Sequence, residues 1–256
     1  TPTNVNLIED INKTASNSAN TLTIKAGTSK AKPWIHHIVI RNSKNIVLDS
    51  LCIYSDISGK GDNALEIDVN SLDWARLDID PTISSVAPML DANITIQNSM
   101  IGSAGFTGVH VSCYGGITFK NNDFECTYPG TESNDIKWGA SAKFLACKDV
   151  KFIQNNFRGS QATLLWVQEC QNMLFMNNVF WNTNTNANDT YQPIAAVRLV
   201  HQFNAKTDDY YNKSDIKNIS CFYNTFYLAE DKKDSNHNYN FFVLSNTTDS
   251  HSSSAA

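Results

Sequence analysis

Four stretches of this sequence repeat one pattern: Ile117–Phe124 (ITFKNNDF), Val150–Phe157 (VKFIQNNF), Met173–Phe180 (MLFMNNVF) and Ile219–Phe226 (ISCFYNTF). Each has apolar residues at alternate positions at its start, asparagine as its sixth residue and phenylalanine at its end. Stretches that start at Ile46 and Ile94 share the apolar positions. The six starts are separated by 48, 23, 33, 23 and 46 residues, which is one or two periods of twenty-three plus additional loop residues. Such a period indicates stacked structural units.

Each unit is predicted to consist of short strands, because its apolar residues alternate with a period of two. The turn signals of β-hairpins, Asn-Gly and Asp-Gly, are missing between these strands. We therefore expect every strand to pair with its equivalent one unit later, which gives three parallel sheets around an apolar interior. The asparagine column, Asn122, Asn155, Asn178 and Asn224, is expected to adopt left-handed backbone torsions at a bend and to bond from rung to rung.

These rungs resemble those of the right-handed parallel β-helix of the pectin-lyase-like superfamily. The similarity covers Leu22 to Val243, most of the chain. It implies an all-β solenoid of about seven coils. It also implies a secreted, periplasmic or cell-surface protein that acts on or binds carbohydrate, since members of this superfamily include lyases, hydrolases, esterases and adhesins.

The ends of the coil need separate treatment, because an open coil exposes apolar interior and unpaired strand edges. Helical spacing of apolar residues predicts an amphipathic capping helix over 4–16. Asn240–Leu244 looks like the first strand of a further coil, so we expect a monomer or a part of a larger chain. The sequence thus divides into an N-terminal cap, the β-helix with four long insertions, and a polar tail: 1–20; 21–246, with insertions 70–91, 127–140, 182–191 and 204–214; and 247–256.

Composition excludes some classes of function. Twenty basic residues against twenty-five acidic ones, with no basic cluster, disfavour a nucleic-acid partner. No apolar stretch approaches the length of a membrane span. The six cysteines are interpreted as mainly buried thiols and not as disulfides, because Cys147 and Cys170 occupy the same place in successive units.

The first strand of each coil carries the candidate chemistry. When these strands are aligned, the positions that face the interior are all apolar, and the outward positions form files along the coil axis. Neighbouring rungs of a parallel sheet are only about 5 Å apart. The alignment therefore predicts a continuous outer file on this sheet: Glu66 and Asp68, His110, Lys143, Trp166 and Arg198.

These residue types match what a site for an acidic sugar requires. Lys143 or His110 could act as the base and Arg198 could neutralise a uronate carboxylate. The expected substrate-binding residues are Trp166, Gln168, Arg41 and Trp138. The expected ligands of a Ca²⁺ ion are Glu66, Asp68 and Asp62. The competing interpretation is a charged outer sheet face, where acid–base neighbours stabilise strands without doing chemistry.

Three hypotheses on function follow. The first is a polysaccharide lyase that cleaves an acidic, uronate-containing polysaccharide by β-elimination. The second is a glycoside hydrolase that uses Glu66, Asp68 or a loop carboxylate, since hydrolysis requires two carboxylates at about 5 to 9.5 Å. The third is a non-catalytic glycan-binding or surface module.

Overall fold

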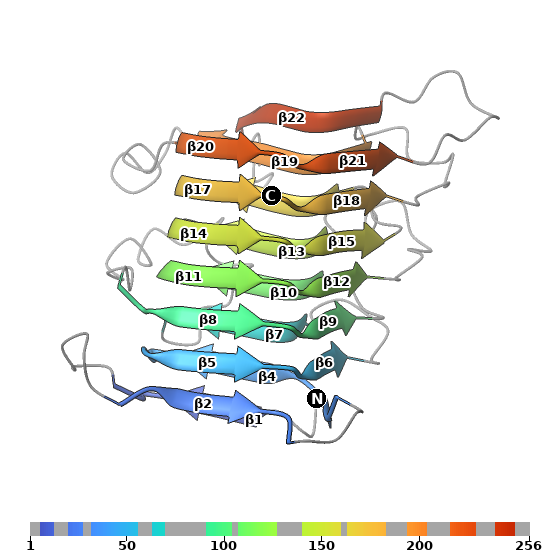
Figure 1. Cartoon of the computed structure of the whole chain (residues 1–256). Coiled ribbons are helices and arrows are strands. Elements are labelled where there is room, and N and C mark those ends of the chain that lie inside the picture. Colours follow the sequence, from blue (N-terminus) through green and yellow to red (C-terminus); the bar gives the residue numbers. More distant parts are fainter. Residues whose placement is uncertain are drawn as a thin grey trace, which may run out of the picture.

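The structure, a computed structural model, describes the chain over 6–12, 20–27, 32–55, 63–69, 91–103, 107–126, 140–159, 163–182, 194–203, 216–228 and 239–248. Within these ranges every regular element is a strand. The strands stack in successive coils to form a parallel β-helix (Figure 1). The predicted fold class, three parallel sheets and about seven coils, is confirmed.

Each sheet collects one strand from every coil. The first sheet has eight strands: β1 (Asn6–Glu9), β4 (Ile38–Arg41), β7 (Asn63–Asp68), β10 (Thr107–Ser112), β13 (Ala140–Leu145), β16 (Thr163–Gln168), β19 (Ile194–Phe203) and β22 (Tyr239–Thr248). The second has seven: β2 (Leu22–Lys25), β5 (Ile46–Asp49), β8 (Ile94–Gln97), β11 (Gly115–Lys120), β14 (Lys148–Ile153), β17 (Gln171–Met176) and β20 (Lys217–Phe222). The third also has seven: β3 (Trp34–Ile35), β6 (Cys52–Ser55), β9 (Met100–Ser103), β12 (Asp123–Cys126), β15 (Asn156–Gly159), β18 (Val179–Asn182) and β21 (Thr225–Leu228).

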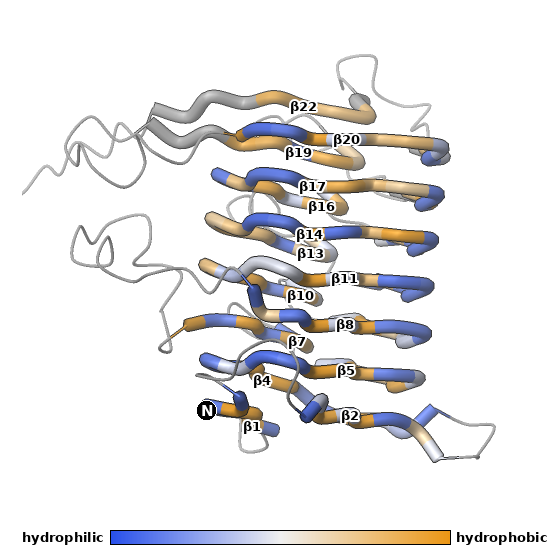
Figure 2. The backbone as a smooth tube through the Cα atoms, turned by 60° about the vertical axis from the view of Figure 1, so that its left-hand side comes forward, coloured by the Kyte–Doolittle hydropathy of each residue, from blue (hydrophilic) through white to orange (hydrophobic). Residues whose placement is uncertain are grey.

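The interior is built from files of equivalent side chains. Phe124, Phe157 and Phe180 stack face to face, with ring centroids 4.4 and 4.8 Å apart and nearly parallel planes. Phe119, Phe152 and Phe175 form a second stack. Figure 2 shows the same hydropathy pattern recurring on successive coils, with hydrophilic bends at matching places. The predicted stacking of identical coils is therefore confirmed.

The asparagine column forms a continuous hydrogen-bonded ladder inside the bend between the second and third sheets. Nδ2 of Asn155 donates to Oδ1 of Asn178 (3.0 Å) and to the carbonyl of Phe119 (3.0 Å). Oδ1 of Asn155 accepts from the backbone N–H of Asn122 (3.0 Å). The same pattern continues to Asn224. The predicted bonding between rungs is confirmed, and each amide also satisfies backbone groups that the bend frees from the sheets.

The predicted backbone conformation of this column is wrong by one residue. Positive φ angles belong to the residues directly before the ladder positions, among them Asn121 (54°), Gln154 (57°) and Asn177 (56°). The left-handed residue turns the chain, and the next residue then points its side chain inward to bond along the ladder. Asparagine is common at both positions, so the sequence alone did not separate the two roles.

The N-terminal segment differs from its prediction. Asn6–Glu9 form strand β1, which pairs in parallel with β4, so the capping helix over 4–16 is wrong for these residues. Asp10 and Asn12 have positive φ angles, which a right-handed helix does not allow. The segment is short, and pairing with the edge of β4 outweighs its helical spacing. Residues 4–5 and 13–16 lie outside the described ranges.

At the other end, β22 pairs with β19 and reaches Thr248, into the range expected as a polar tail. The strand predicted over Asn240–Leu244 is thereby confirmed. The four insertions lie almost entirely outside the described residues. The buried thiols are confirmed where described: Cys52, Cys113, Cys147 and Cys170 are free and buried, whereas Cys221 is free and exposed.

The thiol file continues toward the N-terminus through a tyrosine. Cys147 and Cys170 are stacked, with the backbone N–H of Cys147 3.4 Å from Sγ of Cys170. One coil earlier, Tyr114 takes the equivalent bend position, since its carbonyl accepts from Lys148 just as that of Cys147 accepts from Gln171. The Tyr114 hydroxyl reaches the bend at Ser43, accepting from its N–H (2.7 Å) and donating to its carbonyl (3.2 Å). Tyr114 thus spans the coil that contains β7 and β8, and burial raises its pKa.

Candidate functional site

The predicted outer file is present on the first sheet. Glu66 lies opposite His110, which lies opposite Lys143 on the next strand. Lys143 lies opposite Trp166, and Trp166 opposite Arg198. The file therefore crosses five successive strands, from β7 to β19. We call these five residues, Glu66, His110, Lys143, Trp166 and Arg198, the basic file. Its alignment was predicted from the repeat, including the register of Arg198.

Four of the five residues of the basic file are buried, and only Glu66, with 22% of its side chain exposed, is partly open to solvent. The exposed fractions of His110, Lys143, Trp166 and Arg198 are 5%, 5%, 3% and 6%. All six residues of β10, β13 and β16 are buried on both faces of the sheet. Buried charges are rare without compensation, so the arrangement differs from ordinary surface polarity. Burial of several ionisable groups in one place is typical of functional sites, although structural networks show it too.

Trp166 lies between two cations. Nζ of Lys143 is 5.6 Å from the indole centroid, and Cζ of Arg198 is 4.8 Å from it on the adjacent rung. Both distances are in the range of cation–π attraction. The indole Nε1–H donates to Oε1 of Gln168 (3.1 Å). Trp166 and Gln168, both predicted to bind substrate, are thus hydrogen-bonded to each other. The indole also stabilises the buried positive charges of Lys143 and Arg198.

His110 is the neutral member of the file. Burial, reinforced by the adjacent Lys143, lowers the pKa of His110 to about 4. The imidazole is therefore unprotonated at neutral pH and can accept a proton. Glu66 is ionised. Burial alone raises the pKa of Glu66, but hydrogen bonds from His37 and Asn63 outweigh it, and the pKa lies below its ordinary value.

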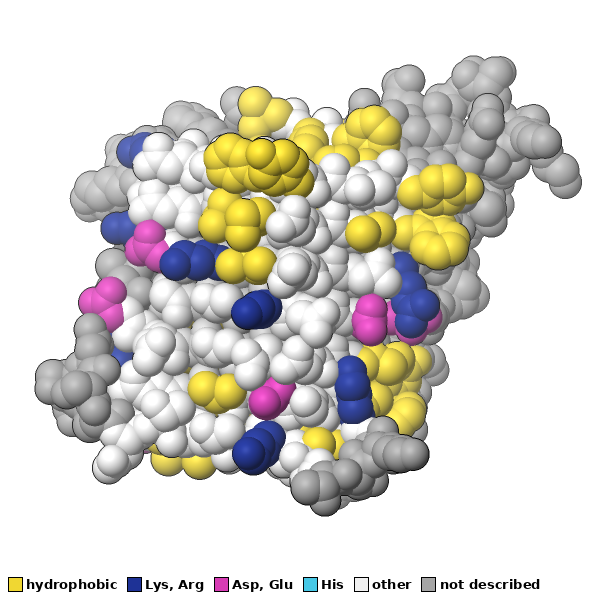
Figure 3. Space-filling model, viewed as in Figure 1, with side chains coloured by type: hydrophobic (Ala, Val, Ile, Leu, Met, Phe, Trp, Pro, Cys, Tyr) yellow, Lys and Arg dark blue, Asp and Glu magenta, His cyan; other side chains and the backbone are white. Residues whose placement is uncertain are grey.

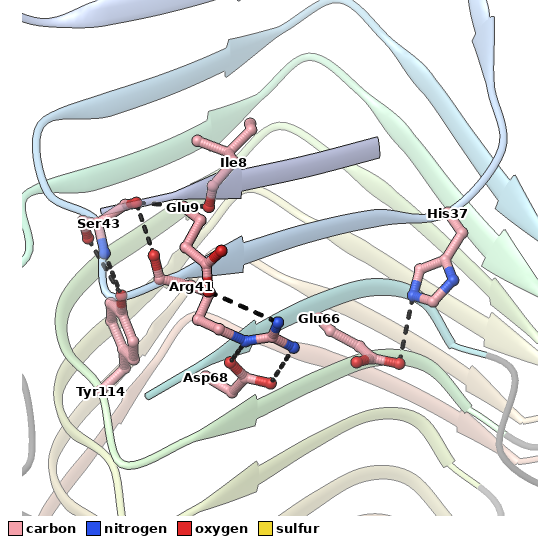
Figure 4. A network of polar contacts seen from close by, with 8 residues as sticks. All are labelled: Ile8, Glu9, His37, Arg41, Ser43, Glu66, Asp68 and Tyr114. Atoms are coloured by element: carbon pink, nitrogen blue, oxygen red, sulfur yellow. Dashed lines mark hydrogen bonds and ion pairs between the residues drawn. The ribbon is translucent and has the colours of Figure 1, made fainter. Parts of the chain in front are cut away.

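The carboxylates of this sheet already face positively charged or donor groups (Figure 4). Oε1 of Glu66 lies 3.2 Å from Nε2 of His37 and accepts from Nδ2 of Asn63 (3.0 Å). Arg41 donates two hydrogen bonds to the carboxylate of Asp68, from Nε to Oδ1 (2.9 Å) and from Nη2 to Oδ2 (3.4 Å). Among the described residues, no group of three His, Cys, Asp or Glu side chains could hold a metal ion. The predicted metal ligand Asp62 and the predicted substrate-binding Trp138 lie outside the described residues.

Two contributors were not predicted from the sequence. His37 precedes β4 and its Nε2 lies 3.2 Å from the carboxylate of Glu66, whereas Asn63 begins β7 and donates a hydrogen bond to that carboxylate. The positions equivalent to Asn63 on the next strands carry threonine or alanine, so the repeat provided no signal for this asparagine. The adjacent histidines His36 and His37, next to a predicted strand, were the one available indication.

The comparisons with known proteins support the fold. A family model described as right handed beta helix region matches residues 57–206, more than half of the chain. Searches of curated proteins and of solved structures found no significant match. Within the described residues, no helix has the length and apolar character needed to cross a bilayer. Such domains usually occur in the pectin-lyase-like superfamily and point to a carbohydrate-active or surface protein. The chain belongs to the right-handed β-helix family.

Proposed function

We propose that this protein is a polysaccharide lyase that cleaves an acidic, uronate-containing polysaccharide by β-elimination at the basic file. The observation that supports this most is the single buried row in which an unprotonated imidazole, His110, adjoins Lys143, with Arg198 two strands further on. Elimination requires a base and, near it, positive charge that stabilises an enolate.

The roles follow from the charges. His110 takes the proton from the carbon next to the uronate carboxylate, and the electron pair left behind delocalises onto that carboxylate. Lys143, on the strand next to His110, neutralises the charge that develops there, where burial strengthens the interaction. Arg198 lies three strands from His110 and binds the carboxylate of another uronate unit of the same polymer. The bond from the β-carbon to the glycosidic oxygen then breaks, a carbon–carbon double bond forms, and the leaving oxygen takes up a proton. Lys143 remains the alternative base.

The hydrolase alternative has less support. An acid–base pair of carboxylates needs one member that is protonated near neutral pH. The lowered pKa of Glu66 keeps it ionised, and Asp68 is engaged by Arg41. A Ca²⁺ ion held by Glu66, Asp68 and Asp62 stays a prediction. Because the two described carboxylates face a guanidinium and a histidine, the steps above use no metal.

A non-catalytic glycan-binding or surface module is the second candidate. The contacts of Trp166 count against turnover at the basic file, since the indole packs against Lys143 and Arg198 and only 3% of the residue is exposed. A file of this kind also stabilises a sheet without turning over a substrate. Binding and cleavage therefore have to be measured separately.

The test is absorbance of the unsaturated product after incubation with polygalacturonate, alginate and chondroitin. We expect a signal with one of them, and a loss of about a hundredfold or more in the His110→Ala and Lys143→Met variants. Methionine preserves the buried stem of Lys143. The control is Lys151→Met, at an exposed outward position of β14 on the second sheet, which should retain full activity.

Absence of product with all three polymers, from protein that is folded by circular dichroism, would reject the lyase. If gel retardation then showed binding of one polymer that His110→Ala leaves intact, the second candidate would replace it. Reducing sugar released without an unsaturated end would instead favour the hydrolase.

A further inference from the structure

The outer face of the third sheet carries a second ordered file. Strand register places Tyr54, Gly102, Glu125, Arg158, Trp181 and Tyr227 at equivalent outward positions of β6, β9, β12, β15, β18 and β21. We call these six residues the axial strip. In contrast to the basic file, the strip is open: Trp181 is 46% and Tyr227 56% exposed.

Aromatic pairs occupy both ends of the strip. At the C-terminal end the rings of Trp181 and Tyr227 lie 5.6 Å apart, nearly perpendicular. At the N-terminal end Tyr54 meets Trp34 of β3, with centroids 5.3 Å apart and an interplanar angle of 62°. Trp34 is 64% exposed. Each pair makes an open corner of two rings and not a flat apolar patch.

The middle of the strip is polar. Nη2 of Arg158 donates to Oε2 of Glu125 (3.3 Å), and both side chains are partly exposed. On the neighbouring outward file Asn156 donates to Asp123 (3.2 Å). Figure 3 shows hydrophobic side chains toward both ends of this face, with acidic and basic side chains between them.

Gly102 leaves the N-terminal part of the axial strip without a projecting side chain on β9. A Cβ atom at this position would lie 2.7 Å from the carbonyl oxygen of Glu125 and 3.0 Å from the Tyr54 ring. The Tyr54 ring therefore lies against Gly102. Because Gly102 has no side chain, the surface is lower at this strand than at Tyr54 and Glu125 on either side. Tyr54 and Trp181 are four strand spacings apart, or about 19 Å at the usual spacing of parallel strands.

We propose that the axial strip binds a neutral polysaccharide chain that runs along the coil axis. Aromatic rings offer a face for the C–H groups of a pyranose, and the polar tips of tyrosine and tryptophan tolerate water nearby. Carboxylate, amide and guanidinium groups in the middle can hydrogen-bond to sugar hydroxyls. An oligosaccharide long enough to span the strip contacts both aromatic corners at once, whereas a monosaccharide contacts only one.

The charges of this face select a neutral ligand. Asp123 and Glu125 outnumber Arg158, so an acidic polysaccharide gains nothing here that it would not gain at the basic file. A protein partner is disfavoured because the core of a protein interface is depleted of charged residues, whereas the centre of this strip is an ion pair. The two faces would then take two different glycans.

The experiment is affinity electrophoresis and calorimetry of the full chain with cellulose-, mannan- and xylan-derived oligomers from the monomer to the hexamer. We expect one series to bind, with affinity rising with length until both corners are contacted. Trp181→Ala should weaken the hexamer about tenfold or more and the monomer less. The matched control is Phe222→Ala, which removes an exposed aromatic side chain of the second sheet and should change nothing.

Three results would overturn this proposal. These are no binding of any series by folded protein, binding that Trp181→Ala leaves unchanged, and a concentration-dependent dimer of the protein that Trp181→Ala abolishes. The third result would make the strip a contact between copies of this chain. Lys143→Met tests the lyase proposal and should leave binding to the axial strip intact, so the two proposals fail separately.

Discussion

The first and third sheets each carry a file of equivalent outward residues on successive strands, yet the two files differ in their exposure to solvent. Apart from Glu66, the basic file of the first sheet is almost fully buried, whereas Trp181 and Tyr227 of the axial strip on the third sheet are open to solvent. Both contain tryptophan next to arginine on adjacent rungs: Trp166 beside Arg198, and Trp181 beside Arg158. In the first case the cation lies over the indole, and in the second the arginine bonds a carboxylate.

The difference shows that position in the repeat determines which residues are neighbours. Burial then determines their pKa values and whether they interact with one another or with a ligand. On the first sheet burial lowers the pKa of His110, whereas the pKa of Glu66 is lowered by its polar partners in spite of burial, so each charge depends on its partners. On the third sheet water screens the same groups, which leaves rings and hydrogen-bonding atoms available to a ligand.

The largest expected contrast is between two tryptophans. Trp166→Ala removes a 3%-exposed side chain and should lower the free energy of unfolding by about 3–5 kcal/mol. Trp181→Ala, at an open position, should lower it by less than about 1 kcal/mol. Urea unfolding followed by circular dichroism measures both. Equal losses would contradict the assigned burial of the two faces.

The asparagine ladder stabilises the coils that carry both the basic file and the axial strip, so its loss should lower the stability of the whole β-helix and not of one face alone. Asn155→Ala leaves the N–H of Asn122 and the carbonyl of Phe119 without these bonds inside the bend, which should cost about 3 kcal/mol. The neighbouring Asn156→Ala removes one half-exposed bond to Asp123 and should cost less than about 1 kcal/mol. The same urea titration compares them, and a larger loss for Asn156→Ala would contradict the ladder.

The buried file predicts a dependence of stability on pH. The pKa of His110 is about 4 in the folded state and about 6.5 when unfolded, so between these values the unfolded chain binds the proton more readily. Stability should therefore be complete above pH 6.5 and fall by up to about 3 kcal/mol as the pH drops toward 4.

The His110→Asn variant should flatten that slope in unfolding curves measured from pH 7 to 4. Lys143→Met should make the drop smaller and end it at a higher pH, since it removes the cation that helps to lower the pKa of His110 in the folded state. An unchanged slope in His110→Asn would mean that other groups cause it.

The smallest expected contrast is between two ion pairs. Arg41→Met leaves the nearly buried carboxylate of Asp68 without its guanidinium and should cost about 2 kcal/mol. Arg158→Met breaks a solvent-exposed pair with Glu125 and should change stability by less than about 0.5 kcal/mol. Thermal unfolding at low and high salt checks both, and a larger effect at Arg158 would reverse the comparison.

Much of the fold could be predicted because one period fixes many positions at once. The phenylalanine stacks, the asparagine ladder and the alignment of the basic file all follow from equivalent residues lying one rung apart. Once the interior positions of β10, β13 and β16 were apolar, His110, Lys143 and Trp166 had to face outward together.

The remaining features depend on information that the repeat lacks. The burial of the basic file depends on what lies over the sheet, not on the strands themselves. The contacts of His37 and Asn63 with Glu66 come from residue types that do not recur along the repeat, since Thr107 and Ala140 follow Asn63 in register. Strand β1 was mistaken for helix because four residues are too few to separate a period of two from one of 3.6.

The most direct test of the site is a crystal structure of the Lys143→Met protein with oligomers of polygalacturonate, alginate or chondroitin. We predict one uronate unit with the carbon that loses its proton beside the His110 imidazole, and a further unit of the same oligomer with its carboxylate within hydrogen-bonding distance of Arg198, three strands away. A crystal in which a bound uronate oligomer contacts only the third sheet, or any surface away from His110 and Arg198, would contradict the account.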